Sequence, residues 1–501
     1  MRRMIAALLL TSALAACTSP PTGARPSASP VPASATPPPP APAEPRNVVF
    51  VLTDDLSMNL LPYLPNVQAL AAQGTSFTDF TVTDSLCCPS RASILTGKFP
   101  HNTGVFTNEG ADGGFTTFER RGNEKSTFAT DLKSAGYRTA FLGKYLNRYF
   151  PDDKHVPPGW TDWVGAGGAY QQYEYVLLEN GRITRHGSRP QDYLGDVLSA
   201  KASAFITASA AAKKPFLVEV STFAPHAPFT PAPADLKSFP GLRAPRGKAF
   251  GTLPTDPPSW LAKHPPMSPA ELKALDVAFR KRVQAGQGVD RMVASLRATL
   301  DRTGVADDTV VVFTSDNGFH LGEYRLNPGK QTALDTDVRV PLIVAGPGVR
   351  AGAVVTVPAE NIDLRPTFDE LAGLTPPPDV DGRSLVPLLT GPAPAGWRDL
   401  ALIEHHGPLD NPADPDNPQP RSGNPPSYQA IRSTRFTYVE YANGDREYYD
   451  LTNDPDQLHN LVRTLPAADL ARLHERVAAL SACRGSGCRE ADGSATAPVP
   501  Q

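Results

Sequence analysis

The stretch Asn47-Val-Val-Phe-Val-Leu-Thr-Asp-Asp55 decides the fold class of this chain. Its apolar run is short and unbroken, which is typical of a strand that is buried on both faces. Such strands belong to mainly parallel sheets that helices cover on both sides. Asp54 and Asp55 come directly after the run, at the end of the strand where α/β proteins gather their ligands. We therefore expect these two carboxylates at a functional site.

The residues up to position 395 repeat this pattern of strands and helices. Further strands are expected over 137–142, 216–220, 309–314 and 340–344. Helices are expected over 64–72, 128–135, 268–300 and 364–374, and the third is expected to be interrupted near Gly286 and Gly288. The alternation predicts an α/β domain over 47–395, with a large, mainly parallel mixed sheet flanked by helices.

The pattern changes after Gly396. Short strands are expected over 400–404, 428–433, 435–441 and 447–450, with Asn443-Gly444 as a hairpin signal, and a helix is expected over 467–480. These elements predict a smaller antiparallel subdomain over 396–482, followed by a tail over 483–501 that frays past Cys488. Cys483 and Cys488 are close enough in sequence to close a small loop, which an exported protein can oxidise to a disulfide.

The first residues of the chain have the pattern of an export signal. Arg2 and Arg3 precede an apolar run that ends at Ala16, so we expect residues 1–16 to be a secretory signal peptide. The run closes on Leu14-Ala15-Ala16-Cys17, which resembles the bacterial lipobox. That resemblance implies that Cys17 carries lipid and anchors a cell-surface lipoprotein to the membrane. The alternative is an unlipidated secreted protein in which Cys17 is incidental.

Composition limits the partners. Residues 17–46 are rich in Pro, Ala and Ser and are typical of an extended linker, which fits the 54 prolines of the chain. The formal net charge of the 501 residues is −3, so there is no global electrostatic attraction for nucleic acid. We expect an exported protein that does not bind nucleic acid.

A second motif, Cys87-Cys88-Pro89-Ser90-Arg91, stands at the start of a short helix that ends before Gly97. Proline suits the first turn of a helix, and glycine suits the position just past its end. The free N–H groups at the N-terminus of a helix favour negative charge. The motif therefore predicts a small anion site with a reactive side chain at its edge. The alternative is that both cysteines simply pack in the core.

Asp316 and Asn317 leave another expected strand, as Asp54 and Asp55 leave the first. Three carboxylates and one amide are hard oxygen ligands, which suit Ca²⁺ or Mg²⁺. Taken separately, the two pairs are also typical of a helix cap and a plain turn. Together, at two strand ends, they favour a metal site.

The string Cys87-x-Pro89-Ser90-Arg91 with Leu95-Thr96-Gly97 resembles the signature of the type I sulfatases, which belong to the alkaline phosphatase superfamily. The resemblance implies an alkaline-phosphatase-like fold. It also implies that Cys87 is oxidised to formylglycine by a formylglycine-generating enzyme and becomes the catalytic nucleophile. The expected activity is hydrolysis of a sulfate monoester, an aryl or carbohydrate sulfate, to inorganic sulfate and an alcohol.

The same resemblance implies the site residues. A divalent cation, usually Ca²⁺, with Mg²⁺ left open, is expected on Asp54, Asp55, Asp316, Asn317 and modified Cys87. Lys144, His226 and Lys330 are expected to contact the sulfate group or the leaving oxygen, with His226 as proton donor, although the division of roles between His226 and Lys330 stays open. Ser90 and Arg91 are expected to position the nucleophile, and His320 to lie near the substrate.

One position departs from many arylsulfatases, which carry a histidine where this chain has Leu146. The string Gly143-Lys-Tyr-Leu-Asn147 is similar to that of members acting on glucosamine 6-sulfate groups, so the departure concerns the subfamily. Two other functions are kept as alternatives. One is a phosphoesterase or phosphonate ester hydrolase of the same superfamily. The other is a lipoprotein that binds sulfated glycans without hydrolysing them, which unmodified Cys87 and a missing metal would favour.

Overall fold

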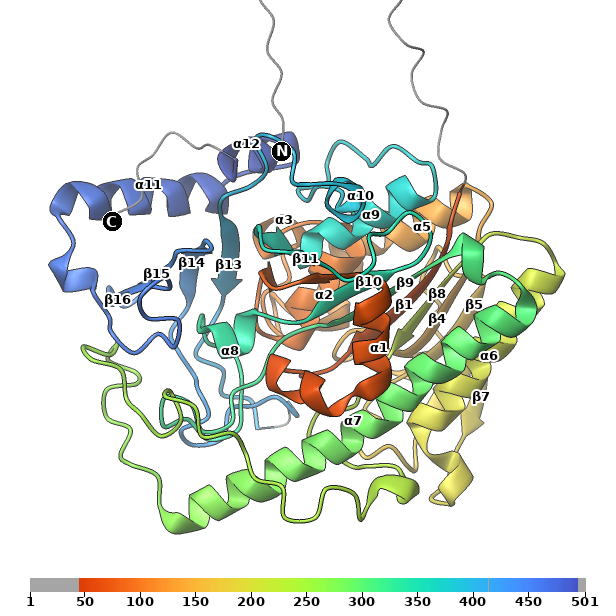
Figure 1. Ribbon diagram of the computed structural model, residues 1–501, viewed down its shortest axis with the longest axis horizontal. Coiled ribbons are helices and arrows are strands. Elements are labelled where there is room, and N and C mark those ends of the chain that lie inside the picture. Colours follow the sequence, from red (N-terminus) through yellow and green to blue (C-terminus); the bar gives the residue numbers. More distant parts are fainter. Residues whose placement is uncertain (1–44, 413, 494–501) are drawn as a thin grey trace, which may run out of the picture. The chain divides into compact units, whose positions relative to one another are not determined.

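The computed structural model describes residues 45–412 and 414–493 (Figure 1). The expected signal peptide, Cys17 and nearly all of the linker lie outside the described residues. Among the helices that the structure describes, none combines the length and the apolar character needed to cross a membrane.

A ten-stranded mixed sheet forms the centre of the protein, in the order β11-β2-β10-β9-β1-β8-β4-β5-β6-β7. The strand β1 (Asn47–Thr53) lies inside it, parallel to β8 (Phe216–Ser221) on one side and to β9 (Thr309–Ser315) on the other. The other strands are β2 (Thr75–Phe77), β4 (Arg138–Lys144), β5 (Asp162–Ala166), β6 (Val176–Glu179), β7 (Arg182–Arg185), β10 (Leu342–Ala345) and β11 (Ala353–Val355). Two short strands, β3 (Phe80–Thr81) and β12 (Ala359–Glu360), pair separately. The predicted α/β fold class is confirmed.

Helices cover both faces of the sheet. The apolar side chains of β1 alternate between two cores: Val48, Phe50 and Leu52 enter one, and Val49 and Val51 enter the other. Each such side chain contributes about 1.5–3 kcal/mol when it is fully buried. The first core is closed by α2 (Cys87–Thr96), α4 (Gly114–Arg120), α5 (Phe128–Ser134), α9 (Leu364–Leu371) and α10 (Val386–Thr390). The second is closed by α1 (Pro65–Gln73), α6 (Leu194–Ala211) and α7 (Pro269–Thr303). Short helices α3 (Pro100–Thr103) and α8 (Asp335–Val338) lie in the connections.

The expected interruption of the long helix is wrong. Helix α7, green in Figure 1, runs unbroken through Gly286 and Gly288. A Cβ atom at Gly286 would lie 3.2 Å from Cδ2 of Leu64, and one at Gly288 would lie 3.4 Å from the ring of Tyr193. Each glycine costs a helix about 1 kcal/mol relative to alanine. Close packing against α1 and α6 stabilises the helix enough to offset that cost.

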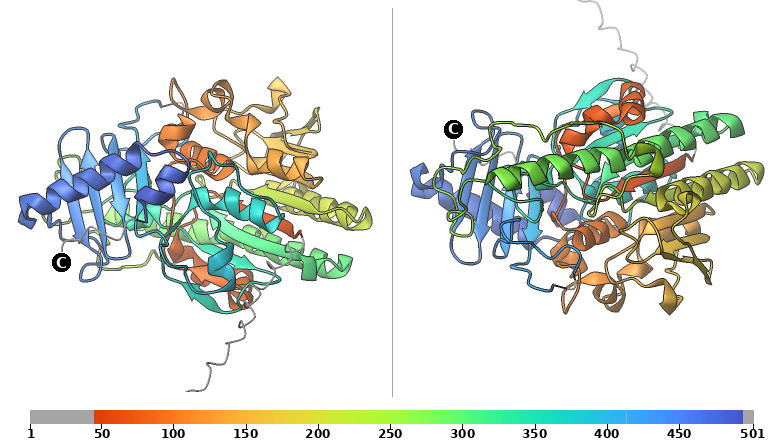
Figure 2. Two further views of the ribbon diagram at one scale, coloured as in Figure 1. Left: turned by 90° about the horizontal axis from the view of Figure 1, so that it is seen from above. Right: turned by 90° about the horizontal axis from the view of Figure 1, so that it is seen from below.

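The C-terminal part is a four-stranded antiparallel sheet, as predicted. It runs in the order β13 (Ala401–His405), β14 (Tyr428–Arg432), β15 (Phe436–Tyr441), β16 (Arg446–Asp450). Helix α11 (Ala467–Ser481) lies across these strands, which Figure 2 shows from above. This sheet and the ten-stranded sheet belong to one compact unit.

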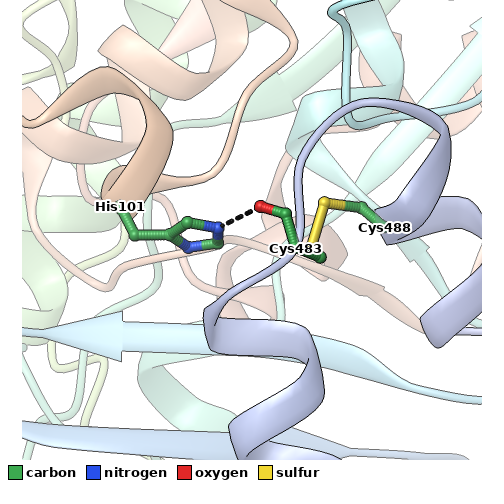
Figure 3. A group of neighbouring side chains, drawn as sticks. All are labelled: His101, Cys483 and Cys488. Carbon is green, nitrogen blue, oxygen red and sulfur yellow. Dashed lines mark hydrogen bonds between the residues drawn. A yellow bond between two sulfur atoms is a disulfide. The ribbon is translucent and has the colours of Figure 1, made fainter.

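The sequence predicts that the chain frays past Cys488. This expectation is wrong for residues 489–493, the last that the structure describes. Residues Ser486–Ala491 form helix α12, and Cys488 is joined to Cys483 by a disulfide (Figure 3). The side chain of Asp492 also forms buried ion pairs, with Arg383 and Arg398. These links hold the segment against the domain, which residue composition alone does not reveal.

Candidate active site

The carboxyl ends of the parallel strands bring the predicted side chains together. Asp54 and Asp55 follow β1, Asp316 and Asn317 follow β9, and Lys144 ends β4. All five side chains are buried. Since parallel strands end at one edge of a sheet, residues more than 250 positions apart meet there. The backbone N–H of Asp55, for example, donates to Oδ1 of Asp316 over 3.3 Å.

Cys87 lies at the N-terminus of α2 and faces this edge. Its Sγ lies 2.8 Å from Nζ of Lys330, 3.3 Å from Oδ1 of Asp54 and 3.5 Å from Oδ2 of Asp416. Burial, together with the charges of Asp416 and Asp54, raises the pKa of the Cys87 thiol well above its ordinary value. A thiol reacts as a nucleophile only when it is ionised. The unmodified cysteine is therefore poorly suited to act as a thiolate nucleophile.

Two lysines supply positive charge beside Cys87. Nζ of Lys144 lies 2.6 Å from Oδ2 of Asp54, and Nζ of Lys330 lies 2.6 Å from Oδ1 of Asp55. Burial opposes the charge of both lysines, but the neighbouring carboxylates raise their pKa values well above the ordinary value. Burial also opposes ionisation of Asp54, but the cations around Asp54 hold the pKa of its carboxyl below the usual range. The lysines therefore carry fixed positive charge.

His226 follows β8 and is placed as a proton donor. Its Nε2 lies 2.7 Å from Oδ1 of Asp416 and 3.7 Å from Oδ2 of Asp55, and its Nδ1 lies 2.7 Å from the carbonyl oxygen of Ala227. Burial works against the charged imidazolium, but Asp55 and Asp416 raise the pKa of His226 to about 9. The ring is then protonated at neutral pH, with Nδ1–H donating to the backbone and Nε2–H facing the site.

Arg91 and Ser90 hold the helix that carries Cys87. Nε of Arg91 donates to Oδ2 of Asp316 over 2.7 Å, and one of its terminal nitrogens donates to the backbone oxygen of Lys144 over 2.8 Å. Burial opposes the charge of Arg91, yet Asp316 raises its pKa. Ser90 donates to the backbone oxygen of Asp316. Both side chains thus tie α2 to the ends of β4 and β9.

The residues at this edge fit a hard divalent cation. Oxygen, nitrogen or sulfur atoms of Asp54, Asp55, Cys87 and His226 all lie within 4.8 Å of one another. Oδ1 of Asn317 is buried and has no hydrogen-bond partner, while its Nδ2 donates to Asp55 over 2.7 Å. Asp55 has a φ of 62°, a conformation that is uncommon for residues other than glycine, and its side chain is buried. An oxygen-rich set of this kind suits Ca²⁺ or Mg²⁺.

Two further groups of ligand-type side chains occur in the part of the chain that the structure describes. One consists of Glu119, Glu124 and His155 near the surface. The other consists of His101, Cys483 and Cys488 (Figure 3), but its sulfur atoms are joined to each other. His101 instead contacts the carbonyl oxygen of Cys483 over 2.9 Å through Nε2, and Glu404 over 2.7 Å through Nδ1. That second group therefore has a structural role.

His320 does not join the other predicted residues. Its Nδ1 lies 2.9 Å from both carboxylate oxygens of Asp337, and its Nε2 lies 3.1 Å from the backbone oxygen of Ser422. The side chain is fully buried. Both ring nitrogens are thus used within the protein, and the expected contact of His320 with substrate stays a prediction.

The prediction from sequence missed Asp416 and Asn108. Asp416 lies in residues 406–427, which connect two neighbouring antiparallel strands, β13 and β14. Such strands need only about 2–5 connecting residues, so a connection of this length is itself a signal of function. Asn108 donates through Nδ2 to Oδ2 of Asp416 over 2.8 Å. No sequence signal distinguishes Asn108.

A pocket of about 350 Å³ opens beside these residues. Lys144 and Asn147 line it on the side of the catalytic edge, and Tyr170 and Phe223 supply aromatic walls. Asp414 lines it from the 406–427 connection, and burial beside Asp416 raises the pKa of Asp414 to about 6. The pocket is large enough for a small ring-shaped group next to Lys144 and Asn147.

Family models and relatives among known proteins agree on one family for this chain. A model described as "Sulfatase" matches residues 46–374, and one described as "N-sulphoglucosamine sulphohydrolase, C-terminal" matches residues 322–482. N-acetylglucosamine-6-sulfatase of Homo sapiens is 36% identical over 474 residues, which cover 88% of this chain and 86% of that protein. Arylsulfatase of Volvox carteri is 30% identical, covering 88% and 75%.

Solved structures share the fold. One, described as a complex with its substrate D-glucosamine-2-N,6-O-disulfate, has a TM-score of 0.72 and 24% identity, and covers 91% of this chain and 100% of that chain. The phosphonate monoester hydrolase of Agrobacterium radiobacter has a TM-score of 0.66 and 22% identity, covering 87% and 96%. At these identities the likeness establishes the architecture alone.

Proposed function

This chain belongs to the sulfatase family, and we propose that it hydrolyses the sulfate ester of a sulfated carbohydrate. Sulfatases are sulfuric ester hydrolases, so the products are inorganic sulfate and an alcohol. The substrate class is supported by the 36% identical N-acetylglucosamine-6-sulfatase and by the Gly143–Asn147 string.

One observation supports the reaction most directly: two buried lysines and a histidine of raised pKa surround Cys87, and burial raises the pKa of its thiol well above the ordinary value. A sulfuryl group is anionic, and its transfer builds charge on the leaving oxygen. Fixed cations and a proton donor are the groups that such a transfer needs. The raised pKa of the thiol disfavours a thiolate nucleophile, whereas the surrounding cations suit sulfuryl transfer to a modified Cys87.

We propose that Cys87 is oxidised to formylglycine by a formylglycine-generating enzyme. The family generally uses this residue together with a divalent metal ion. Hydrated by water, formylglycine would supply a geminal diol: one hydroxyl oxygen would bond to sulfur as the bond from sulfur to the alcohol oxygen breaks, and deprotonation of the other hydroxyl would expel sulfate and restore the aldehyde. Asp54, Asp55, Asp316, Asn317 and residue 87 would hold the metal, for which we propose Ca²⁺ over Mg²⁺. The ion would supply positive charge to a sulfate oxygen and to the nucleophile.

The other side chains then have separate tasks. Lys144 and Lys330 hold the sulfuryl oxygens by charge, and Lys330 is the closer of the two to residue 87. His226 donates the Nε2 proton to the leaving alcohol oxygen, which its pKa of about 9 allows at neutral pH. Arg91 and Ser90 keep α2 and Asp316 in register.

We also propose that the protein is exported and anchored to the bacterial membrane through lipid on Cys17. The proposal rests on the sequence of residues 1–17 alone. Incorporation of labelled fatty acid into the wild-type chain, and its loss in Cys17→Ala, is the expected result. Labelling that persists in Cys17→Ala would contradict the anchor.

The proposed modification is tested by mass measurement of the peptide ending at Arg91 from active, natively expressed protein. We expect the mass of formylglycine at position 87, and Cys87→Ala should lose turnover of sulfate esters. A plain thiol in fully active enzyme would falsify the mechanism. Turnover rates on matched sulfate and phosphonate esters distinguish a sulfatase from a phosphonate ester hydrolase. Faster turnover of the phosphonate ester would favour the phosphonate ester hydrolase.

A further inference from the structure

The 406–427 connection places a carboxylate inside the catalytic centre. The side chain of Asp416 is about 2% exposed, although the described residues of this connection, 406–412 and 414–427, form no helix or strand. Its backbone oxygen accepts a hydrogen bond of 3.1 Å from Nε2 of Gln331, and its N–H donates to Oδ1 of Asp414 over 3.0 Å. The segment is thereby fixed with its acidic side chain beside Cys87.

Four side-chain nitrogen donors from separate parts of the fold converge on this one carboxylate. Oδ1 of Asp416 lies 2.8 Å from Nζ of Lys330 and 2.7 Å from Nε2 of His226. Oδ2 of Asp416 accepts from Nδ2 of Asn108 over 2.8 Å and from Nδ2 of Asn147 over 3.3 Å. The cations around it, despite the cost of burial, hold the pKa of Asp416 well below its ordinary value. The four donors form a cradle for an oxyanion.

We propose that the Asp416 carboxylate occupies the place of the substrate's sulfate group, so that the 406–427 connection is a plug and Asn108 and Asn147 are sulfate-binding residues. The proposal rests on the proposed function, which assigns Lys330 and His226 to the sulfate ester. Those two side chains cannot serve Asp416 and a substrate anion at once, because one set of donors would face two negative charges. Asp416 therefore withdraws when substrate binds.

The two asparagines have the geometry of ligand-binding groups. Oδ1 of Asn108 accepts the backbone N–H of Cys88 over 3.1 Å, which fixes its amide so that Nδ2 faces the cradle. In the part of the chain that the structure describes, Oδ1 of Asn147 is buried without a hydrogen-bond partner. Nδ2 of Asn147 donates to Oδ2 of Asp416. Asn147 also lines the pocket that Lys144 borders. Once Asp416 leaves, both Nδ2 groups are free to donate to sulfate oxygens.

Binding of inorganic sulfate to the calcium-loaded full chain tests the plug, measured by titration calorimetry. A protein whose binding-competent state is rarely populated binds more weakly by that fraction. We expect Asp416→Ala to bind sulfate at least about tenfold more tightly than wild type. The matched control is Asp410→Ala, which removes an exposed carboxylate from the same connection and should change affinity less than about twofold.

Further variants test whether Asp416 weakens sulfate binding by filling the cradle or only by repelling the sulfate charge. Asp416→Asn removes the charge but still fills the cradle, so it should tighten sulfate binding less than Asp416→Ala does. In the Asp416→Ala background, Asn108→Ala and Asn147→Ala should each weaken sulfate binding about fivefold or more, since each removes a donor to a charged group. Equal tightening by Asp416→Asn and Asp416→Ala would overturn the plug, as would sulfate affinity that Asp416→Ala leaves unchanged or weakens.

Turnover distinguishes this proposal from the proposed function. If Asp416→Ala tightens sulfate binding as expected and no variant hydrolyses sulfate esters, the plug stands and the proposed function fails. If wild type hydrolyses sulfate esters and Asp416→Ala leaves sulfate affinity unchanged, the proposed function stands and the plug fails.

Discussion

Replacement of Lys330 by alanine is the sharpest test of the catalytic arrangement. Nζ of Lys330 lies 2.8 Å from Sγ of Cys87, so at an effective dielectric constant of about 20 its attraction for a unit negative charge there is about 6 kcal/mol. Water that enters the vacated space replaces part of this attraction. Losing one well-placed donor to a developing oxyanion costs about 2.7–4 kcal/mol in other enzymes. We therefore expect kcat to fall about 10²- to 10³-fold.

The assay is initial-rate hydrolysis of a chromogenic aryl sulfate and of glucosamine 6-sulfate, with thermal unfolding measured on the same samples. Lys98→Ala is the matched control: Nζ of Lys98 lies 2.5 Å from Asp379, but the aspartate side chain is 56% exposed. A surface pair of this kind is worth about 0–1 kcal/mol, so both rate and stability should stay near wild type. A folded Lys330→Ala enzyme with kcat within threefold of wild type would show that Lys330 does not stabilise the transition state.

Three other outcomes are expected. Chelation of divalent cations should lower turnover at least about 100-fold, and added Ca²⁺ should restore it better than Mg²⁺, as measured by rates after dialysis. Arg398→Met should destabilise the protein by about 3–5 kcal/mol in urea unfolding, because it leaves Glu360 and Asp363 buried without their cation. Burial opposes the charge of His101, but Glu404 raises the pKa of its imidazole. The loss of stability in His101→Gln should therefore be largest below a pH of about 6.5, and it should disappear as the pH rises through the folded-state pKa, as measured by urea unfolding at a series of pH values.

Residues at strand ends could be predicted from the sequence because topology brings them together. An apolar run such as 47–53 marks a strand without any alignment, and parallel strands end at one edge whatever their separation in the chain. Asp54, Asp316 and Lys144 follow such runs, so their meeting needs no knowledge of loops. The family resemblance singled out Lys144 at its strand end and added His226 and Lys330, which stand beyond the end of a strand.

The remaining features depend on packing that periodicity does not encode. Asp416 contacts Cys87 across 329 positions from a connection whose described residues form no helix or strand, so no sequence pattern placed Asp416 in the centre. Gly286 does not break α7, because the helix approaches Leu64 closely at that point. His320 stands only three residues after Asn317, yet the chain has already turned away, and its ring pairs with Asp337.

The charges of the centre give a reason for a carboxylate at this place. Three cationic side chains face three acidic ones within one cluster: Lys144, Lys330 and His226 against Asp54, Asp55 and Asp416. Buried charges are costly unless opposite charges match them, so removing Asp416 alone leaves a buried excess of positive charge. A substrate sulfate brings the compensating negative charge with it. The plug and the substrate are therefore alternatives that satisfy the same electrostatic demand, and a neutral sugar without sulfate gains nothing by displacing Asp416.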